Sequence, residues 1–344
     1  MAAFKQRPSI PVIDVDLSSD TSWSSALRLS PCNGSKLLTA FNKQGEGVIG
    51  SMRWSLLKLS AGALHSLLGS HYEEEINDLA DHFNMPARDV LLANAAYDIS
   101  NVGCSTIAAA TPNGPLHARN LDWEFPRSLL KKHLVVARMK NGPCGDYAAV
   151  TWPGLFGVIT GVAPGRFSIT VNFVRSEEES GYLGLPKRAA LGYWPVSWAV
   201  RRAFDEAKDF NAAVKLLKSE FLLSPVLLTV VGTKNDERVV IERGCDRNAL
   251  RKATGGEPLL VTNHYVSGKL SDDNVDLEDW DTCERLEALE RKTADKQVTV
   301  DSAFKVLSSS AIFADDTQHQ VVMQPKTGQM IVRVPGGATL DLQL

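Results

Sequence analysis

The stretch Asn101-Val-Gly-Cys-Ser-Thr-Ile-Ala-Ala-Ala-Thr-Pro-Asn-Gly-Pro-Leu-His-Ala-Arg-Asn-Leu-Asp-Trp123 contains two apolar runs separated by a turn. The first run begins at Cys104, and the second carries Arg119 and Asp122. Asn-Gly is a common dipeptide of two-residue hairpin loops, so the spacing predicts two antiparallel strands joined at Asn113-Gly114. This pattern indicates a strand-rich region with a cysteine at the beginning of one strand and charged side chains on the next.

Two registers of this hairpin are compatible with the sequence. A tip at Asn113-Gly114 places Asp122 opposite Ser105, one residue from Cys104. The prolines that flank the tip cannot donate ladder hydrogen bonds, so a shift by one residue would bring Cys104 directly opposite Asp122. In either register we expect the Asp122 carboxylate near the backbone nitrogen of Cys104.

The rest of the chain predicts helices before Cys104 and mostly strands directly after it. A short strand is expected at residues 9–17, helical periodicity covers residues 54–100, and Pro86 marks the start of a second helix there. Further strands are expected at 104–110, 116–123, 134–139, 147–151, 155–160, 166–174, 226–232, 238–243, 319–324 and 329–334. Further helices are expected at 195–206, 211–222, 282–292 and 300–308. This order favours layered α+β packing over an alternating βαβ sheet.

The composition is that of a globular protein with a sizeable core. The chain has 344 residues, 44% hydrophobic and 22% charged, which suits one large domain or two smaller ones. A net charge of −3 gives no electrostatic reason to expect nucleic acid as a partner. The chain lacks both an apolar run of about eighteen residues and an N-terminal signal segment, so we expect no transmembrane segment and a cytoplasmic protein.

Metal and cofactor motifs are missing from the sequence. The 5 cysteines form no C-x-x-C pair, which argues against a zinc site or a disulfide framework and leaves at least one thiol free. The glycines between Gly154 and Gly165 do not form a phosphate-binding loop, and neither a Gly-x-Ser-x-Gly nor a His-Glu-x-x-His motif occurs. We therefore expect neither a cofactor nor a metal.

Cys104 is the candidate nucleophile. A cysteine that becomes a new chain terminus carries its own base, because its α-amine has a reference pKa of about 8, beside about 8.5 for the thiol. Asp122 could hold that amine, and Arg119 could favour the thiolate and bind a substrate carbonyl. The local pattern alone favours a small buried cysteine and a surface Arg–Asp pair over a catalytic site.

The segment resembles the acid ceramidase and N-acylethanolamine-hydrolysing acid amidase family. This family lies within the cysteine branch of N-terminal-nucleophile hydrolases, together with bile salt hydrolase and penicillin V acylase. Its usual string is Cys-Thr-Ser-Ile-Val-Ala, followed by His-Gly-Arg-Asn-(Leu/Met)-Asp. Here the string is Cys104-Ser-Thr-Ile-Ala-Ala, followed by His117-Ala-Arg-Asn-Leu-Asp122.

The similarity extends over most of the chain, in the family's order. Asn94-Ala-Ala-Tyr-Asp98 is similar to the Asn-x-x-Tyr-Glu helix before the nucleophile, and residues 152–172 are similar to a Gly-rich strand pair. Val261-Thr-Asn263 resembles the Thr-Asn-Tyr-Asp segment, in which the asparagine supports the oxyanion. A later family arginine that helps to hold the site matches Arg285, although a solvated helix arginine paired with Asp281 fits the local sequence equally well.

The resemblance implies an α+β fold, the four-layer αββα sandwich of N-terminal-nucleophile hydrolases. It implies self-cleavage between Gly103 and Cys104, giving a helical N-terminal subunit of residues 1–103 and a catalytic subunit of residues 104–344. The implied activity is hydrolysis of the linear amide of an N-acylated amine with an apolar acyl group, such as an N-acylethanolamine or a ceramide-like lipid. A bile salt or penicillin V-type acylase and an inactive lipid-binding relative are the alternatives.

Overall fold

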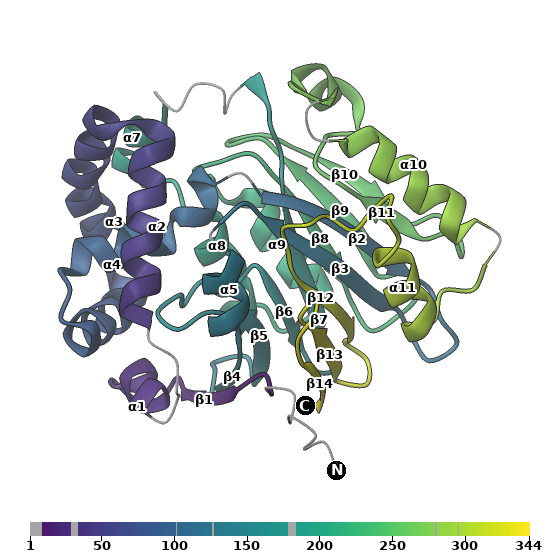
Figure 1. Ribbon diagram of the computed structural model, residues 1–344, viewed down its shortest axis with the longest axis horizontal. Coiled ribbons are helices and arrows are strands. Elements are labelled where there is room, and N and C mark those ends of the chain that lie inside the picture. Colours follow the sequence, from purple (N-terminus) through teal and green to yellow (C-terminus); the bar gives the residue numbers. More distant parts are fainter. Residues whose placement is uncertain are drawn as a thin grey trace, which may run out of the picture.

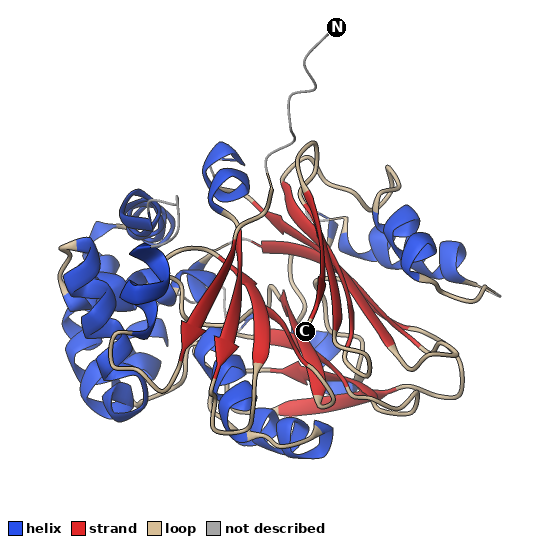
Figure 2. Ribbon diagram, turned by 90° about the horizontal axis from the view of Figure 1, so that it is seen from below, coloured by secondary structure: helices blue, strands red, loops and turns tan. Residues whose placement is uncertain are grey.

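The computed structural model describes residues 9–28, 34–100, 102–125, 127–177, 184–278, 281–294 and 296–344. Two β-sheets face each other at its centre, with helices outside both sheets and a further group of helices at one end (Figures 1 and 2). The α+β class expected from the order of the apolar patterns is confirmed.

The larger sheet has eight strands in the order β1-β4-β5-β6-β7-β8-β9-β10. Their bounds are β1 Val12–Asp16, β4 Val135–Lys140, β5 Tyr147–Thr151, β6 Thr160–Ala163, β7 Phe167–Phe173, β8 Val226–Val231, β9 Arg238–Arg243 and β10 Asn248–Lys252. Neighbouring strands are antiparallel except β1, which runs parallel to β4. The central strands β5 to β9 are buried along their whole length, because helices cover one face and the second sheet covers the other.

The smaller sheet has six strands in the order β11-β2-β3-β12-β13-β14. Their bounds are β2 Val102–Ala109, β3 Leu116–Trp123, β11 Leu259–Val261, β12 Thr317–Gln324, β13 Gln329–Arg333 and β14 Thr339–Gln343. Strand β2 contacts β7 and β8 of the larger sheet, so the two sheets share a core. The segment that begins at Cys104 therefore lies at the centre of the molecule.

Helices cover the outer faces of both sheets. Helices α8 (Val196–Glu206) and α9 (Phe210–Ser219) cover the larger sheet, where Phe204 stacks on Tyr147. Helices α10 (Thr282–Thr293) and α11 (Val300–Leu307) cover the smaller sheet, where they contact β11, β3 and β12. The layers thus run helices, sheet, sheet, helices (Figure 2). The N-terminus of α11 is fixed locally, since Thr299 and Ser302 form a capping box.

The first third of the chain is mostly helical, as its periodicity predicts. Its elements are α1 Ser22–Arg28, α2 Gly34–Ile49, α3 Ser51–Phe83, α4 Ala87–Asn94 and the 3-10 helix η1 Ala96–Ile99. Pro86 is the N-cap of α4, as expected. The helices α2 to α4 stand beside the sheets in the purple and blue part of Figure 1. Two helices drawn in teal, α5 (Arg127–His133) and α7 (Gly184–Ala190), contact this group. No helix in the described part of the chain has the length and apolar character needed to cross a membrane.

The strand expected at 155–160 is wrong. Residues 152–159 form turns, and β6 begins only at Thr160. Pro153 has no N–H to donate to a ladder, and Gly154 has a φ of 93°, a left-handed conformation that favours glycine. The apolar residues of this segment are buried in a loop, and their apolar character alone could not distinguish a buried loop from a buried strand.

Both expected registers of the central hairpin are also wrong. Asp122 pairs with Gly103 and Cys104 pairs with Leu121, while the ladder ends at Ala109 and Leu116. The connection is longer than two residues, because the N–H of Gly114 donates to the carbonyl of Thr111 and closes a turn around Pro112 and Asn113. Proline fits the second position of such a turn, so Asn113-Gly114 is not the tip of a two-residue loop.

Candidate active site

The hairpin of β2 and β3 presents two different faces. Side chains of directly paired residues lie on the same face, and successive residues alternate. Cys104, Leu121 and Arg119 therefore face the larger sheet, whereas Gly103 and Asp122 face the helices α10 and α11. The candidate site thus spans both faces of the beginning of β2.

The Cys104 side chain is fully buried beside Arg119. Nη2 of Arg119 lies 2.6 Å from the Cys104 sulfur and 2.9 Å from the carbonyl oxygen of Val171. Nη1 donates to the carbonyl of Ile159 at 2.8 Å and to Oγ1 of Thr160 at 2.7 Å, so the guanidinium is fixed from several sides. Burial raises the pKa of the Cys104 thiol, and the Arg119 charge opposes this rise. Arg119 is therefore the group that stabilises a thiolate here.

Asn263 and Arg285 hold the backbone of Cys104 on the opposite side from Arg119. Oδ1 of Asn263 accepts from the Cys104 N–H at 2.8 Å and from Nη2 of Arg285 at 2.9 Å. Nη1 of Arg285 donates to the Cys104 carbonyl oxygen at 2.6 Å. Nδ2 of Asn263 donates to the carbonyl oxygens of Val102 at 3.1 Å and Phe173 at 2.8 Å. Asn263 therefore contacts the chain on both sides of the Gly103–Cys104 bond.

Asp122 lies across from Gly103 on the outer face. Its Oδ1 accepts from Oγ1 of Thr317 at 2.6 Å. Burial raises the pKa of Asp122 to about 6, although Arg285 and the Thr317 hydroxyl lower it. A Cβ at position 103 would lie 3.2 Å from the Asp122 Cβ, so glycine permits this close approach. The carboxyl is thus poised to change protonation state in mildly acidic solution.

All of the site residues expected from the sequence lie in this one cluster, but not in every expected role. The backbone nitrogen of Cys104 contacts Asn263, not Asp122 as both predicted registers required. Arg285 is only 8% exposed and contacts Cys104, so the alternative of a solvated arginine is wrong. Asn120 points away, because its Nδ2 donates to the carbonyl oxygen of Leu307.

The histidines of the motif segments have structural partners. His117 contacts the hydroxyls of Ser168 at 2.8 Å and Thr170 at 2.9 Å. Burial and the nearby Arg119 charge lower the pKa of His117 to about 3, so the ring is neutral. His264 contacts Thr282 at 2.9 Å. Neither ring contacts the cysteine among the described residues, and these residues include no group of His, Cys, Asp and Glu side chains placed to hold a metal ion.

The supporting threonines were missed by sequence reasoning. Thr317 contacts Asp122, Thr160 contacts Arg119, and Oγ1 of Thr282 accepts from the Asn263 N–H at 2.9 Å. They come from three distant segments and belong to no local motif. Only the packing of β12, β6 and α10 around the hairpin identifies them.

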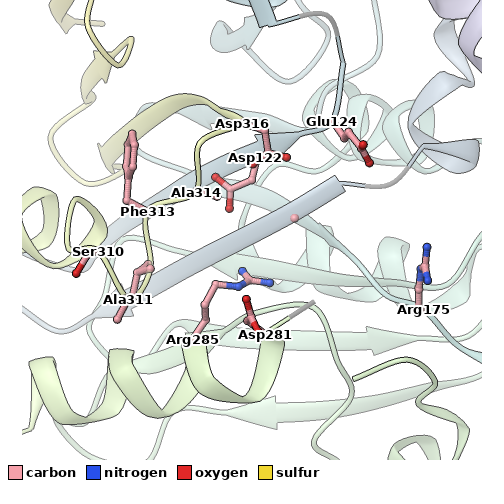
Figure 3. Close-up of a pocket in the computed structure, with 12 residues that line it drawn as sticks. Asp122, Glu124, Arg175, Asp281, Arg285, Ser310, Ala311, Phe313, Ala314 and Asp316 are labelled. Atoms are coloured by element: carbon pink, nitrogen blue, oxygen red, sulfur yellow. The ribbon is translucent and has the colours of Figure 1, made fainter. Parts of the chain in front are cut away.

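A cavity of about 520 Å³ opens beside the cluster on the outer face. Gly103, Asp122 and Arg285 line it, but the Cys104 thiol does not. Figure 3 shows Asp122 and Arg285 approaching this cavity from opposite sides, from β3 and α10. Solvent therefore reaches the residue before Cys104, while the thiol stays enclosed between the sheets.

The chain is similar in sequence to known amidases. The N-acylethanolamine-hydrolyzing acid amidase of Oryctolagus cuniculus is 30% identical over 282 residues, which cover 79% of this chain and 75% of that protein. The acid ceramidase of Heterocephalus glaber is 29% identical over 198 residues, covering 52% and 50% respectively. No family model matches the chain.

The two-sheet α+β fold is shared with a solved structure. The Caenorhabditis elegans N-acylethanolamine-hydrolyzing acid amidase ortholog superimposes with a TM-score of 0.55. The match covers 70% of this chain and 100% of that chain, at 22% sequence identity.

Proposed function

Because this chain belongs to the N-acylethanolamine-hydrolysing acid amidase and acid ceramidase family, we propose that it is a self-processing cysteine amidase. The substrate is the linear amide of an N-acylated amine with an apolar acyl group, an N-acylethanolamine or a ceramide-like lipid. We assign the layered fold to the αββα sandwich of N-terminal-nucleophile hydrolases. The two products of processing are residues 1–103 and 104–344.

One observation carries the proposal: a buried arginine faces the cysteine sulfur, and the amide nitrogen of the same cysteine is held separately. Arg119 lies 2.6 Å from the sulfur, and Asn263 accepts from the nitrogen at 2.8 Å. A structural cysteine in a core requires neither contact. A nucleophile that must attack the bond before its own nitrogen requires both a stabilised thiolate and a positioned leaving group.

Self-cleavage proceeds through a thioester. The Cys104 sulfur attacks the Gly103 carbonyl carbon, a C–S bond forms, and the C–N bond breaks as the proton of the thiol passes to the nitrogen. Asp122 lies beside Gly103 and, with a pKa of about 6, can relay that proton. Water then hydrolyses the thioester, which leaves a carboxyl group on Gly103 and restores the thiol.

The same residues serve the mature site. The new α-amine of Cys104 stays at Oδ1 of Asn263 and acts as the base, so nucleophile and base belong to one residue. Departure of Val102 removes the carbonyl that now occupies Nδ2 of Asn263. That N–H then becomes available to the oxyanion of the tetrahedral intermediate. The amine leaves first, and water releases the acid from the thioester.

The acyl group enters from the apolar side. A small cavity of about 20 Å³ on the inner side of the hairpin is lined by Tyr97, Trp123, Trp152 and Ile159. This volume holds about one water molecule, so an acyl chain needs room that the uncut chain does not provide. Movement of η1, Val102 and Gly103 after cleavage supplies that room and exposes the thiol.

The test is a cleavage and turnover experiment on the full chain. The purified protein is incubated between pH 4.5 and 8, and its intact mass and N-terminal sequences are followed with time. We expect a fragment that begins at Cys104, and hydrolysis of N-palmitoylethanolamine only after that fragment forms. Cys104→Ala should abolish both reactions, whereas the matched variant Cys283→Ala, on α10, should retain both.

Amidase activity that persists in Cys104→Ala would contradict the proposal. A chain that stays intact at every pH and turns over no amide would favour the inactive lipid-binding relative. The thiol is 0% exposed in the uncut chain, so reaction with a thiol reagent at this position also reports whether the site has opened.

A further inference from the structure

The cavity of about 520 Å³ opens beside Gly103, Asp122 and Arg285, next to the residue whose sulfur would attack an amide. The substrate carbonyl carbon under attack must lie at the Cys104 sulfur. Its two substituents, the acyl chain and the amine (here the amine half), then extend in different directions. One direction leads to the aromatic side chains of Tyr97 and Trp123 between the sheets, which suit the acyl chain. The other leads past Gly103 into this open polar cavity. The amine half is therefore the part that meets the residues of the cavity wall.

The wall of the cavity carries more negative than positive charge. Its carboxylates are Asp122, Glu124, Asp281 and Asp316, and its guanidinium groups are Arg175 and Arg285. Nη1 of Arg175 forms an ion pair with Asp276 at 2.9 Å, and Arg285 is directed to the Cys104 backbone. Both positive charges are thus already engaged within the protein.

Two of the carboxylates, those of Glu124 and Asp281, line the cavity and are exposed to solvent. Glu124 follows β3 and Asp281 precedes α10, and Figure 3 shows both at the cavity wall. Within the described residues, neither side chain makes a hydrogen bond or an ion pair, and Asp281 does not cap α10 with its side chain. Asp281 also adopts a φ of 46°, an uncommon conformation for a residue other than glycine. Among the described residues, these two carboxylates therefore bring negative charge without a partner to the wall of this cavity.

We propose that Glu124 and Asp281 select substrates whose amine half carries a second, protonated nitrogen, that is, N-acylated diamines or polyamines. This inference rests on the proposed amidase function and names the substrate class of the same site. A cationic amine half is attracted to the unpaired carboxylates, and an amine half with its own carboxylate is repelled. Because both side chains are exposed, salt screens the effect, and we expect about a tenfold preference at low ionic strength.

The experiment compares three palmitoyl amides of matched size on cleaved protein at pH 6 in neutral detergent. N-palmitoyl-ethylenediamine carries a positive charge, N-palmitoylethanolamine is neutral, and N-palmitoylglycine is negative. We expect kcat/KM to fall in that order, with the differences shrinking as NaCl rises from 50 to 500 mM. The double variant Glu124→Gln with Asp281→Asn should bring the ratio of cationic to neutral substrate close to 1. Glu284→Gln, on α10 outside the cavity wall, should retain the ratio.

Each outcome decides a separate point. Equal rates for the three amides, or a faster glycine conjugate, would overturn the charge selection and leave the amidase function standing. An unchanged ratio in the double variant would also overturn it. If cleaved protein hydrolyses none of the amides, the amidase function fails and the selectivity fails with it. Cleavage rate and thermal unfolding of each variant show whether the site has stayed folded.

Discussion

The sulfur of Cys104 lies 2.6 Å from Nη2 of Arg119, inside a core where neither side chain meets solvent. Burying an unpaired positive charge is costly, so the contact needs a compensating partner. The carbonyl oxygens of Ile159 and Val171 compensate part of the Arg119 charge, and a Cys104 thiolate would compensate the remainder. The uncut chain thus holds a positive charge ready for the anion that the first chemical step creates.

Replacing Arg119 should prevent processing. Arg119→Lys keeps a positive charge but loses the fork that contacts Ile159, Thr160 and the sulfur together, so we expect self-cleavage to slow at least a hundredfold. The rate of appearance of the two fragments measures it. Arg138→Lys, at an ion pair with Asp14 outside the site, should cleave like the wild type. Normal cleavage of Arg119→Lys would remove this residue from the mechanism.

A substitution at Asn263 can test the roles of its side-chain Oδ1 and Nδ2 atoms separately. Asn263→Asp retains an acceptor for the Cys104 nitrogen and for Arg285 but loses the Nδ2 donor. We expect amide turnover per cleaved molecule to fall about a hundredfold or more, the usual cost of one oxyanion donor. Turnover is normalised to the amount of fragment that begins at Cys104. Wild-type turnover after this normalisation would exclude an oxyanion role for Nδ2.

The uncut protein should lose stability as the pH rises from about 4 to 7. Burial raises the pKa of Asp98 to about 7 and that of Asp122 to about 6, so both hold protons that the unfolded chain releases above pH 4. Over this range the folded state binds more protons, and the free energy of unfolding falls, by roughly 3 kcal/mol for Asp98. Urea unfolding of Cys104→Ala at several pH values measures it. Adding Asp98→Asn should flatten the dependence, and an unchanged slope would contradict this assignment.

After cleavage, buried ion pairs should hold the two fragments together. Nη2 of Arg201 in α8 lies 2.8 Å from Oε1 of Glu75 in α3, so the pair joins residues 1–103 to residues 104–344. Arg201→Met leaves the Glu75 charge without this partner, at a cost of about 3–5 kcal/mol. We expect the cut fragments to separate on size exclusion in mild urea. Arg202→Met, whose partners Glu206 and Glu220 belong to its own fragment, should stay assembled.

Local sequence was enough for the strands and helices whose patterns are long and bounded by turn residues. The strands at 116–123 and 147–151 and the helices at 195–206 and 282–292 were predicted within two residues of their bounds. Their apolar periodicity reflects burial of one or both faces, and burial of a face determines which positions of the local sequence are apolar. The short edge strands β10 and β14 were missed, although Leu340 and Leu342 of β14 do alternate with polar residues.

The sequence by itself determined which residues the site contains. Cys104, Arg119 and Asp122 lie within one hairpin, and Asn263 and Arg285 lie in segments that match a family pattern in the same order. Motif residues of this kind can be found without coordinates, because their spacing along the chain is part of the motif.

Only the tertiary structure decided what each of these residues touches. The turn around Pro112 sets a register that places Asp122 beside Gly103, and Asn263 reaches the Cys104 nitrogen from 159 positions away along the chain. A one-residue change of register moves a side chain to the other face of a sheet, so local spacing cannot fix such contacts. Packing of two sheets and the α10 layer around one strand end fixes them, and it also creates the acidic cavity, whose residues come from separate segments of the chain.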